Sequence, residues 1–277
     1  MENKNKFIII PGMPRAGSSW LFYNLKNHPD ICPPEGYKET FFFGANFVKG
    51  FDWYYSIFKP KASQICLDAS PDYFLNDKFF DNISQFKNDF KIILVLRDPD
   101  EWAISLYNQT KSFTPNIGSF DDFLENCRVQ IDGNFFEYSL NKIDIKKRID
   151  FFLKMFEKKI LLINFNFLIK NQVLTLQKIE NFLDINQYFN ENNVFKNRVN
   201  VSIGKFSYLK YLSTLKYSRF LAFKLLPNFI INFLRKKLYK IDEKKLLSSD
   251  SPSEKNISNF FPKVTKDYFI ENDIRNL

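Results

Sequence analysis

The chain has 277 residues, of which 40 are Lys or Arg and 31 are Asp or Glu, so its formal net charge is +9. Hydrophobic residues make up 45% of the chain, which is enough for a sizeable core and argues against wholesale disorder. Only 8 residues are Gly whereas 34 are Phe, which excludes collagen-like, linker-like and low-complexity classes.

Short apolar segments alternate with helical patterns up to about residue 190. Continuously apolar strands that alternate with helices are typical of a parallel sheet covered on both faces. The expected elements, in chain order, are strand 6–10, helix 17–27, strand 65–68, strand 91–96, helix 99–110, helix 145–157, strand 160–165 and helix 173–183. This order predicts an α/β fold with a P-loop-type, doubly wound parallel sheet flanked by helices.

No internal repeat and no Pro/Gly/Ser-rich linker interrupts the chain, so we expect one domain over residues 1–277. Its α/β nucleotide-binding core would span residues 1–191, and residues 192–277 would form a basic, mainly helical extension. Residues 192–241 hold eleven cations and no Asp or Glu, which leaves 29 cations against 31 anions elsewhere. This asymmetry indicates a polyanionic partner, a membrane surface or an anionic cosubstrate, without choosing among them.

The sequence contains neither a signal-peptide pattern nor a run of 18 apolar residues. We therefore expect a cytoplasmic location. The basic helical pattern over residues 205–241 has three interpretations: packing on the core, peripheral contact with an anionic membrane, or binding of the acceptor. No nucleic-acid-binding motif is present, so we expect no nucleic-acid partner.

Cysteine and histidine are too few to build a metal site. Cys32, Cys66 and Cys127 are far apart and lack metal-ligand spacing, so we interpret them as buried thiols. His28 is the one histidine, and it follows the first expected helix. We interpret it as a helix-end residue in preference to a catalytic base.

The most informative segment joins the first expected strand to the first expected helix. A Gly-bearing loop that enters a helix N-terminus presents N–H donors and the positive end of the helix dipole to a phosphate. The spacing from Gly12 to Gly17 matches a Walker A loop, but Ser18 stands where that motif requires lysine. We infer a phosphate loop whose cation is Arg15, and the missing lysine disfavours a nucleotide-dependent kinase.

A second anion site is predicted where strand 91–96 ends in Arg97. Ligands of an open α/β sheet bind outside the carboxyl ends of its strands, which places Arg97 at the same edge as the phosphate loop. Ser105 lies on the following helix, and an Arg with a Ser makes a minimal phosphate site. On its own, a surface ion pair between Arg97 and a neighbouring acid explains the sequence equally well.

These motifs together resemble those of PAPS-dependent sulfotransferases, where PAPS is 3′-phosphoadenosine 5′-phosphosulfate, and look most like the bacterial and heparan-sulfate-type branch. Residues 12–21 resemble the family's 5′-phosphosulfate loop, and residues 93–105 resemble its 3′-phosphate motif. Residues 38–43 are similar to the segment that carries the branch's catalytic glutamate. Similar segments also occur at residues 50–54 and 70–74, in the family's order.

The resemblance implies transfer of a sulfuryl group from PAPS to a hydroxyl or amine of an acceptor, with PAP (the desulfated nucleotide) as product and no metal. Glu39 would be the general base, and Arg15 would neutralise charge on the leaving 5′-phosphate. The acceptor would be a small molecule, a glycan or a lipid. The residues expected to bind the cosubstrate are Arg15, Ala16, Gly17, Ser18, Ser19, Trp20, Arg97, Ser105, Lys196 and Arg198.

The chain departs from the family pattern at three places. Arg15 replaces the usual Lys, Ser18 and Ser19 replace a pair of Thr, and Ala69 stands where glycosaminoglycan enzymes often carry Lys. The last difference weakens the inference to a heparan-like acceptor. The alternatives to a sulfotransferase are a P-loop kinase and a non-enzymatic protein that binds anions or a membrane surface.

Overall fold

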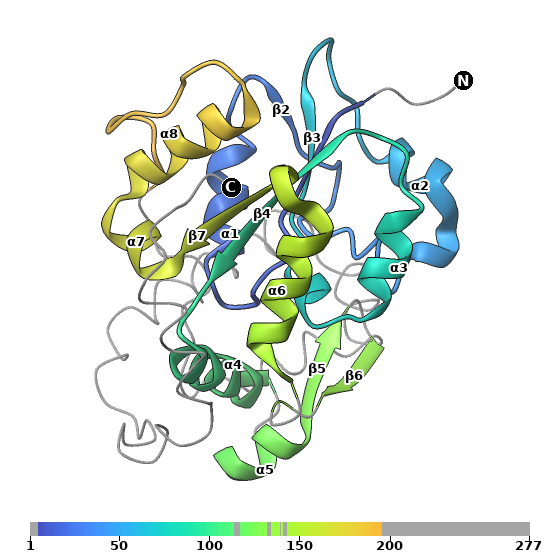
Figure 1. Ribbon diagram of the computed structural model, residues 1–277, viewed down its shortest axis with the longest axis vertical. Helices are drawn as coiled ribbons and strands as arrows, with labels where there is room; N and C mark the ends of the chain where they lie inside the picture. The colour runs from blue at the N-terminus through green and yellow to red at the C-terminus, as the bar shows by residue number, and fades with distance from the viewer. Residues whose placement is uncertain (1–4, 114–116, 132–133, 139, 141–142, 196–277) are drawn as a thin grey trace, which may run out of the picture. The chain divides into compact units, whose positions relative to one another are not determined.

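The computed structural model describes residues 5–113, 117–131, 134–138, 140 and 143–195 (Figure 1). Two compact units are distinguished within these residues. The first contains residues 5–102 and 144–195, and the second contains the described residues between 103 and 143. Most of the expected basic extension, residues 196–277, lies outside the described residues, so its helical character and the single-domain organisation stay predictions.

The first unit is built on a five-stranded sheet in the order β2-β3-β1-β4-β7. Every neighbouring pair in it is parallel, which confirms the predicted fold class. All the expected strands are present. At three of them, the first or last residue differs by one from the expected position. The strands are β1 (Phe7–Ile9), β2 (Ile31–Cys32), β3 (Ile65–Asp68), β4 (Phe90–Leu96) and β7 (Ile160–Asn164).

Helices cover both faces of this sheet. Residues 92–95 of β4 are all fully buried, and consecutive strand residues point to opposite faces, so both faces must be covered. Figure 1 shows α1 and α8 on one side of the sheet and α3 and α6 on the other. The helices of this unit are α1 (Ser18–Leu25), α2 (Gly50–Ser56), α3 (Lys78–Ser84), α6 (Ile145–Phe156), α7 (Phe165–Lys170) and α8 (Gln172–Leu183). Its short 3₁₀ turns are η1 (Phe47–Lys49), η2 (Pro71–Phe74) and η4 (Glu157–Lys159).

Phenylalanine fills the core beside β1. The Phe86 ring contacts those of Phe7 and Phe43 edge-on, with ring centres 5.0 and 5.2 Å apart. Phe79 of α3 stacks on Phe152 of α6 at 5.8 Å. Such edge-on and offset contacts stabilise aromatic pairs beyond the area that they bury. Phenylalanine is therefore a main constituent of the core of the first unit.

The second unit contains most of one long helix and a hairpin. The helix α4 (Pro99–Phe113) begins at the end of the first unit, as the sequence predicts, and continues three residues further than expected. The helix α5 (Phe120–Glu125) starts at Ser119, whose hydroxyl and backbone form a capping box with Asp122. Strands β5 (Cys127–Ile131) and β6 (Asn134–Tyr138) pair antiparallel.

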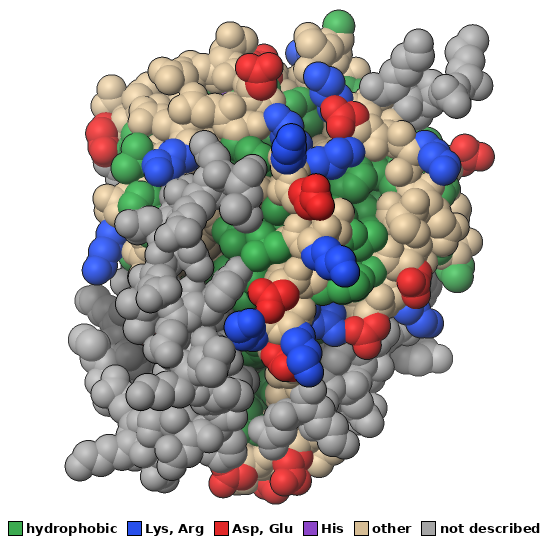
Figure 2. Space-filling model, in the orientation of Figure 1, with side chains coloured by type: hydrophobic (Ala, Val, Ile, Leu, Met, Phe, Trp, Pro, Cys, Tyr) green, Lys and Arg blue, Asp and Glu red, His purple; other side chains and the backbone are tan. Residues whose placement is uncertain are grey.

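The described surface carries a mixture of charges. Figure 2 shows Lys and Arg side chains interspersed with Asp and Glu over the described part of one face. This mixture agrees with the near balance of 29 cations and 31 anions outside residues 192–241. None of the described helices is both long and apolar enough to cross a membrane.

Candidate active site

The loop after β1 enters the N-terminus of α1 with Gly17 at the boundary. Gly17 has φ 88° and ψ 9°, a left-handed conformation that glycine adopts without strain. The first N–H groups of a helix have no partner within the helix, so they present donors and a positive dipole ahead of Ser18. Ala16, Ser18 and Ser19 are all buried, which fixes this turn in place. The geometry suits an anion at the start of α1.

The loop is seated tightly between β4 and η2. The Gly12 carbonyl oxygen accepts a hydrogen bond from the Val95 N–H at 3.0 Å, and the Pro11 carbonyl oxygen accepts one from the Phe74 N–H at 2.7 Å. A Cβ on Gly12 would lie 2.6 Å from both the Pro71 carbonyl oxygen and the Phe74 Cβ. A side chain at residue 12 would collide with these atoms. Gly12 therefore allows the phosphate loop to pack directly on η2.

Two arginines meet beside this loop. Arg97, directly after β4, donates from Nη1 to the main-chain carbonyl oxygen of Arg15 at 3.1 Å. Burial, followed by the charge of Arg97, lowers the pKa of Arg15 to about 10, so Arg15 stays charged at neutral pH. Two partly buried like charges that influence each other suit a multiply charged anion, and the planar guanidinium group matches the geometry of phosphate as it does that of carboxylate.

Arg97 has two further contacts. Its Nε lies 3.4 Å from Glu101 Oε2, one turn into α4, and its Cζ lies 4.6 Å from the centre of the Phe165 ring. Burial lowers the pKa of Arg97, and Glu101 opposes this shift. The Glu101 side chain is half exposed, so water screens the ion pair and weakens it. The ion pair that the sequence offered as an alternative therefore exists, and the same guanidinium also reaches the phosphate loop.

Glu39 lies in the loop after β2, where its side chain is 29% exposed and Oε1 pairs with Lys38 Nζ. The residues that follow it are firmly held, because the Thr40 and Phe41 N–H groups donate to Ser70 Oγ at 3.0 and 3.1 Å. Ser70 directly precedes η2, on which the phosphate loop packs. One segment therefore holds both the Glu39 loop and the phosphate loop.

Asp72 in η2 is a second carboxyl group near Glu39. It is 7% exposed, and neither carboxyl oxygen has a hydrogen-bond partner among the described residues. Burial, together with the negative charges of Glu39 and Asp68, raises the pKa of Asp72 well above its usual range. The N–H groups of Asp72 and Tyr73 oppose this rise.

Trp20, one of the predicted cosubstrate residues, joins α1 to the last described residue. Trp20 donates from Nε1 to the Phe195 carbonyl oxygen at 2.7 Å, and the Phe195 N–H donates to Asn24 Oδ1 at 2.8 Å. The Trp20 indole N–H therefore anchors a distant part of the chain on α1. Lys196 and Arg198 lie outside the described residues, directly after this anchored position.

Ser105 lies on α4 in the second unit, whereas Arg97 belongs to the first. The predicted pairing of Ser105 with Arg97 on one phosphate therefore stays a prediction. The described residues hold no group of three or more His, Cys, Asp or Glu side chains able to bind a metal ion. Cys32 and Cys66 are buried free thiols, as predicted, and burial raises the pKa of Cys66 to about 12.

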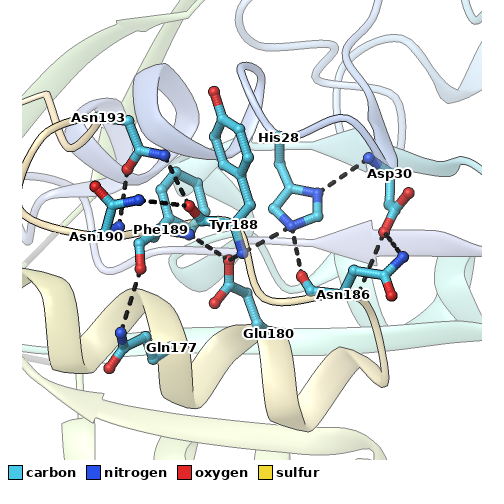
Figure 3. Close-up of polar contacts among 9 residues, drawn as sticks. All are labelled: His28, Asp30, Gln177, Glu180, Asn186, Tyr188, Phe189, Asn190 and Asn193. Atoms are coloured by element: carbon cyan, nitrogen blue, oxygen red, sulfur yellow. Dashed lines mark hydrogen bonds and ion pairs between the residues drawn. The ribbon is translucent and has the colours of Figure 1, made fainter.

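His28 lies among backbone groups at the end of α8 (Figure 3). Its Nδ1 accepts a hydrogen bond from the Asp30 N–H at 3.0 Å, so Nε2 carries the proton. Nε2 lies 3.0 Å from the Asn186 carbonyl oxygen and 3.4 Å from Glu180 Oε1. Glu180 Oε1 also accepts from the Tyr188 N–H at 2.9 Å. These contacts give His28 the structural role that the sequence suggests.

Three residues of the site have no role assigned from the sequence. Asp68, Ser70 and Tyr73 are buried, and their side chains hydrogen-bond to one another. Residues 70–74 resemble a family segment, but the resemblance assigned no function to them. Asp68 closes an apolar strand, and nothing in its spacing marks it as the acceptor of several hydroxyl groups.

Taken together, the fold and these residues define a class: an α/β protein with a phosphate-binding loop at the carboxyl edge of a parallel sheet. The family model described as "Sulfotransferase domain" matches residues 5–222. This match covers most of the chain, so the chain belongs to the sulfotransferase domain family. The family predicted from the motifs is thereby confirmed, and the bacterial part of that prediction stays a prediction.

Individual proteins agree with this family. Human heparan sulfate glucosamine 3-O-sulfotransferase 3B1 is 28% identical over 195 residues, which cover 69% of this chain and 49% of that protein. The membrane-associated sulfotransferase kil1 of Dictyostelium discoideum is 31% identical over 106 residues, 37% of this chain and 22% of that protein. The crystal structure of a sulfotransferase from Alicyclobacillus acidocaldarius matches with a TM-score of 0.54 at 18% identity, covering 72% of this chain and 87% of that one, and supports the fold.

Proposed function

We propose that this protein transfers the sulfuryl group of PAPS to a hydroxyl or amine of an acceptor, with Glu39 as general base and PAP as product. The observation that carries the proposal is the contact between Arg97 and Arg15 at the N-terminus of α1. Two partly buried arginines and the N–H donors at the start of a helix suit a nucleotide with separate phosphate groups. The chain spans only 49% of its human heparan sulfate relative, so the activity is proposed for this domain alone.

The reaction is an in-line displacement at sulfur. The acceptor oxygen or nitrogen forms a bond to sulfur while the bond from sulfur to the bridging oxygen of the 5′-phosphate breaks. The Glu39 carboxylate takes the proton that the acceptor loses. Arg15 and the N–H groups at the start of α1 neutralise the charge that develops on the bridging oxygen and the 5′-phosphate. Ser18 and Ser19 add hydroxyl donors to the same group.

The 3′-phosphate distinguishes this nucleotide from ATP. Arg97 is the residue proposed to bind it, with Ser105 as a second donor. Lys196 and Arg198 are proposed to complete the nucleotide contacts. Because Arg97 also holds the main chain of Arg15, binding at the 3′-phosphate and the shape of the 5′-phosphate loop are expected to depend on each other.

The acceptor is proposed to be a glycan, a lipid or another small molecule. A glycan is the first choice to test, because the human relative is named for the glucosamine of heparan sulfate. Ala69 makes a different sugar as reasonable as heparan sulfate itself, since a neutral side chain lies where glycosaminoglycan enzymes often carry Lys.

A cytoplasmic location with peripheral membrane contact through residues 205–241 is a separate proposal. It is supported by the basic composition of that segment and by the similarity to a membrane-associated sulfotransferase. Co-sedimentation with vesicles of anionic and of neutral lipid tests it. Absence of binding to anionic vesicles at low salt would refute it.

Thermal unfolding with PAP, AMP or ATP and Mg²⁺ tests the nucleotide assignment. The expected result is a clear rise of Tm with PAP and smaller rises with the other two. A larger rise with ATP and Mg²⁺ would instead support a kinase. Mass spectrometry of a panel of sugars, phenols, lipids and amines incubated with PAPS then identifies the acceptor, and loss of turnover in Glu39→Gln tests the base.

A further inference from the structure

Asp68, at the end of β3, accepts hydrogen bonds from four hydroxyl groups. Ser70 Oγ donates to Oδ1 at 2.7 Å. Thr40 Oγ1, Tyr73 OH and Tyr54 OH donate to Oδ2 at 2.8, 3.0 and 3.2 Å. The Asp68 side chain has no exposed surface. Burial raises the pKa of Asp68, and the four hydroxyl groups oppose this rise because they stabilise the charged form.

Three of these four hydroxyl groups also accept hydrogen bonds from the backbone that follows Glu39. Ser70 Oγ accepts from the Thr40 N–H at 3.0 Å and from the Phe41 N–H at 3.1 Å. Tyr73 OH accepts from the Phe43 N–H at 3.1 Å. The Phe42 N–H donates to Thr40 Oγ1 at 3.2 Å. Each N–H group of residues 40–43 therefore points at a hydroxyl whose proton goes to Asp68.

The direction of these bonds depends on Asp68. A hydroxyl group has one proton, and donating it to a carboxylate leaves its lone pairs to accept from the backbone. The main chain of Asp68 also reaches the phosphate loop, because its carbonyl oxygen accepts from the Ile10 N–H at 2.8 Å. The backbone of Asp68 is thus bonded to the residue at which the phosphate loop begins. Its side chain is linked through hydroxyl groups to the loop that carries Glu39.

We propose that Asp68 is the positioning residue for the general base. Through Ser70, Tyr73 and Thr40 it holds the backbone next to Glu39 at a fixed place relative to the phosphate loop. The proposal rests on the proposed function, in which Glu39 takes the acceptor proton while the phosphate loop holds the leaving group. Buried N–H groups need acceptors in any core, so the test must separate positioning of Glu39 from stability alone.

Tyr73 and Tyr54 provide a matched pair for the test. Both side chains are fully buried, and both donate to Asp68 Oδ2. Tyr73 accepts from the Phe43 N–H, whereas no bond from residues 40–43 reaches Tyr54 OH among the described contacts. Tyr73→Phe and Tyr54→Phe each keep the ring and remove one donor to Asp68, so they differ mainly in the link to the Glu39 loop.

The expected result is a fall in kcat of about tenfold or more for Tyr73→Phe, because small displacements of reacting groups have effects of that size. Its Kd for PAP should stay within about twofold, since the phosphate loop is intact. Tyr54→Phe should lower Tm by a similar amount and keep kcat near the wild-type value. Thr40→Val should reduce kcat, and Thr40→Ser, which keeps the hydroxyl, should restore it.

A readout that needs no acceptor accompanies the kinetics. Hydrogen–deuterium exchange of residues 39–43 should be faster in Tyr73→Phe than in Tyr54→Phe. Equal exchange and equal kcat in the two variants would overturn the positioning role. Failure of the proposed function looks different: wild-type turnover in Glu39→Gln would remove the base assignment whatever the tyrosine variants did.

Discussion

Arg97 donates a 3.1 Å hydrogen bond from Nη1 to the carbonyl oxygen of Arg15, so the residue that directly follows β4 supports the main chain of the phosphate loop. Burial lowers the pKa of Arg15, and the positive charge of Arg97 lowers it further. An isolated pair of this kind is unfavourable, and a bound anion relieves the repulsion. We therefore expect nucleotide binding to stabilise the loop.

The first prediction concerns Arg97→Ala. One charge-assisted hydrogen bond is worth about 1.5–3 kcal/mol, so PAP should bind about 10- to 100-fold more weakly to the variant. AMP, which lacks the 3′-phosphate, should lose much less affinity. Isothermal titration with both nucleotides measures the difference. Lys59→Ala, which removes an exposed cation in another part of the first unit, is the control and should change neither affinity. Equal losses for PAP and AMP in Arg97→Ala would refute the 3′-phosphate role.

The second prediction concerns Arg15, whose positive φ of 63° places it in a strained part of the loop. Arg15→Gln removes the cation proposed for the leaving group, and removal of one such group lowers kcat by about 10²–10³-fold. Lys is the residue that the family usually carries here, and Arg15→Lys keeps the positive charge. Its kcat should therefore stay much closer to the wild-type value than that of Arg15→Gln. Single-turnover kinetics at saturating PAPS distinguishes this effect from weaker binding. Similar rates for the Gln and Lys variants would contradict a role of the charge.

The parallel sheet and the phosphate loop were predictable because their signals are local. An apolar run such as residues 91–96 followed by Arg97 marks a buried strand and its carboxyl end. One predicted strand ends earlier than expected because a side chain caps the helix that follows it. The strand expected over residues 160–165 stops at Asn164, because its side chain accepts from the Asn166 and Phe167 N–H groups and starts α7.

The support of Glu39 was not predictable in the same way. Asp68, Ser70 and Tyr73 come together with Thr40 only when β3 places η2 beside the loop after β2. No spacing in the sequence records which hydroxyl donates to which carboxylate. The β5–β6 hairpin was also missed, because its strands carry no continuous apolar run of the kind that marked the buried strands.

The third prediction separates His28 from catalysis. His28→Gln removes the imidazole that accepts from the Asp30 N–H and approaches Glu180, which is fully buried. Loss of such buried hydrogen bonds should reduce the free energy of unfolding by about 1–3 kcal/mol. The kcat of the folded variant should be unchanged, since the residues that His28 contacts in Figure 3 include none proposed for catalysis. Urea unfolding and steady-state kinetics measure the two quantities. Normal stability with lost turnover would make His28 the base.

The fourth prediction uses the buried carboxyl of Asp72. Its pKa is raised well above the usual 3.8, so the folded protein holds this proton more tightly than the unfolded chain does. As the pH rises above about 3.8, the unfolded chain releases the proton first, and the contribution of Asp72 to the free energy of unfolding falls. Below about pH 3.8 the Asp72 carboxyl is protonated in both the folded and the unfolded chain, so its titration does not change the free energy of unfolding.

Asp72→Asn removes this titration while it keeps the size of the side chain. The variant should match the wild type near pH 3 and be more stable at neutral pH by about 1–3 kcal/mol, the scale of an unsatisfied buried group. Urea unfolding between pH 3 and pH 8 measures the difference, with the exposed Asp81→Asn as control. A difference that stays constant with pH, or a variant less stable at neutral pH, would show that Asp72 has a partner in the folded protein. Because the charge of Glu39 contributes to the raised pKa, the gain should be smaller in a Glu39→Gln background.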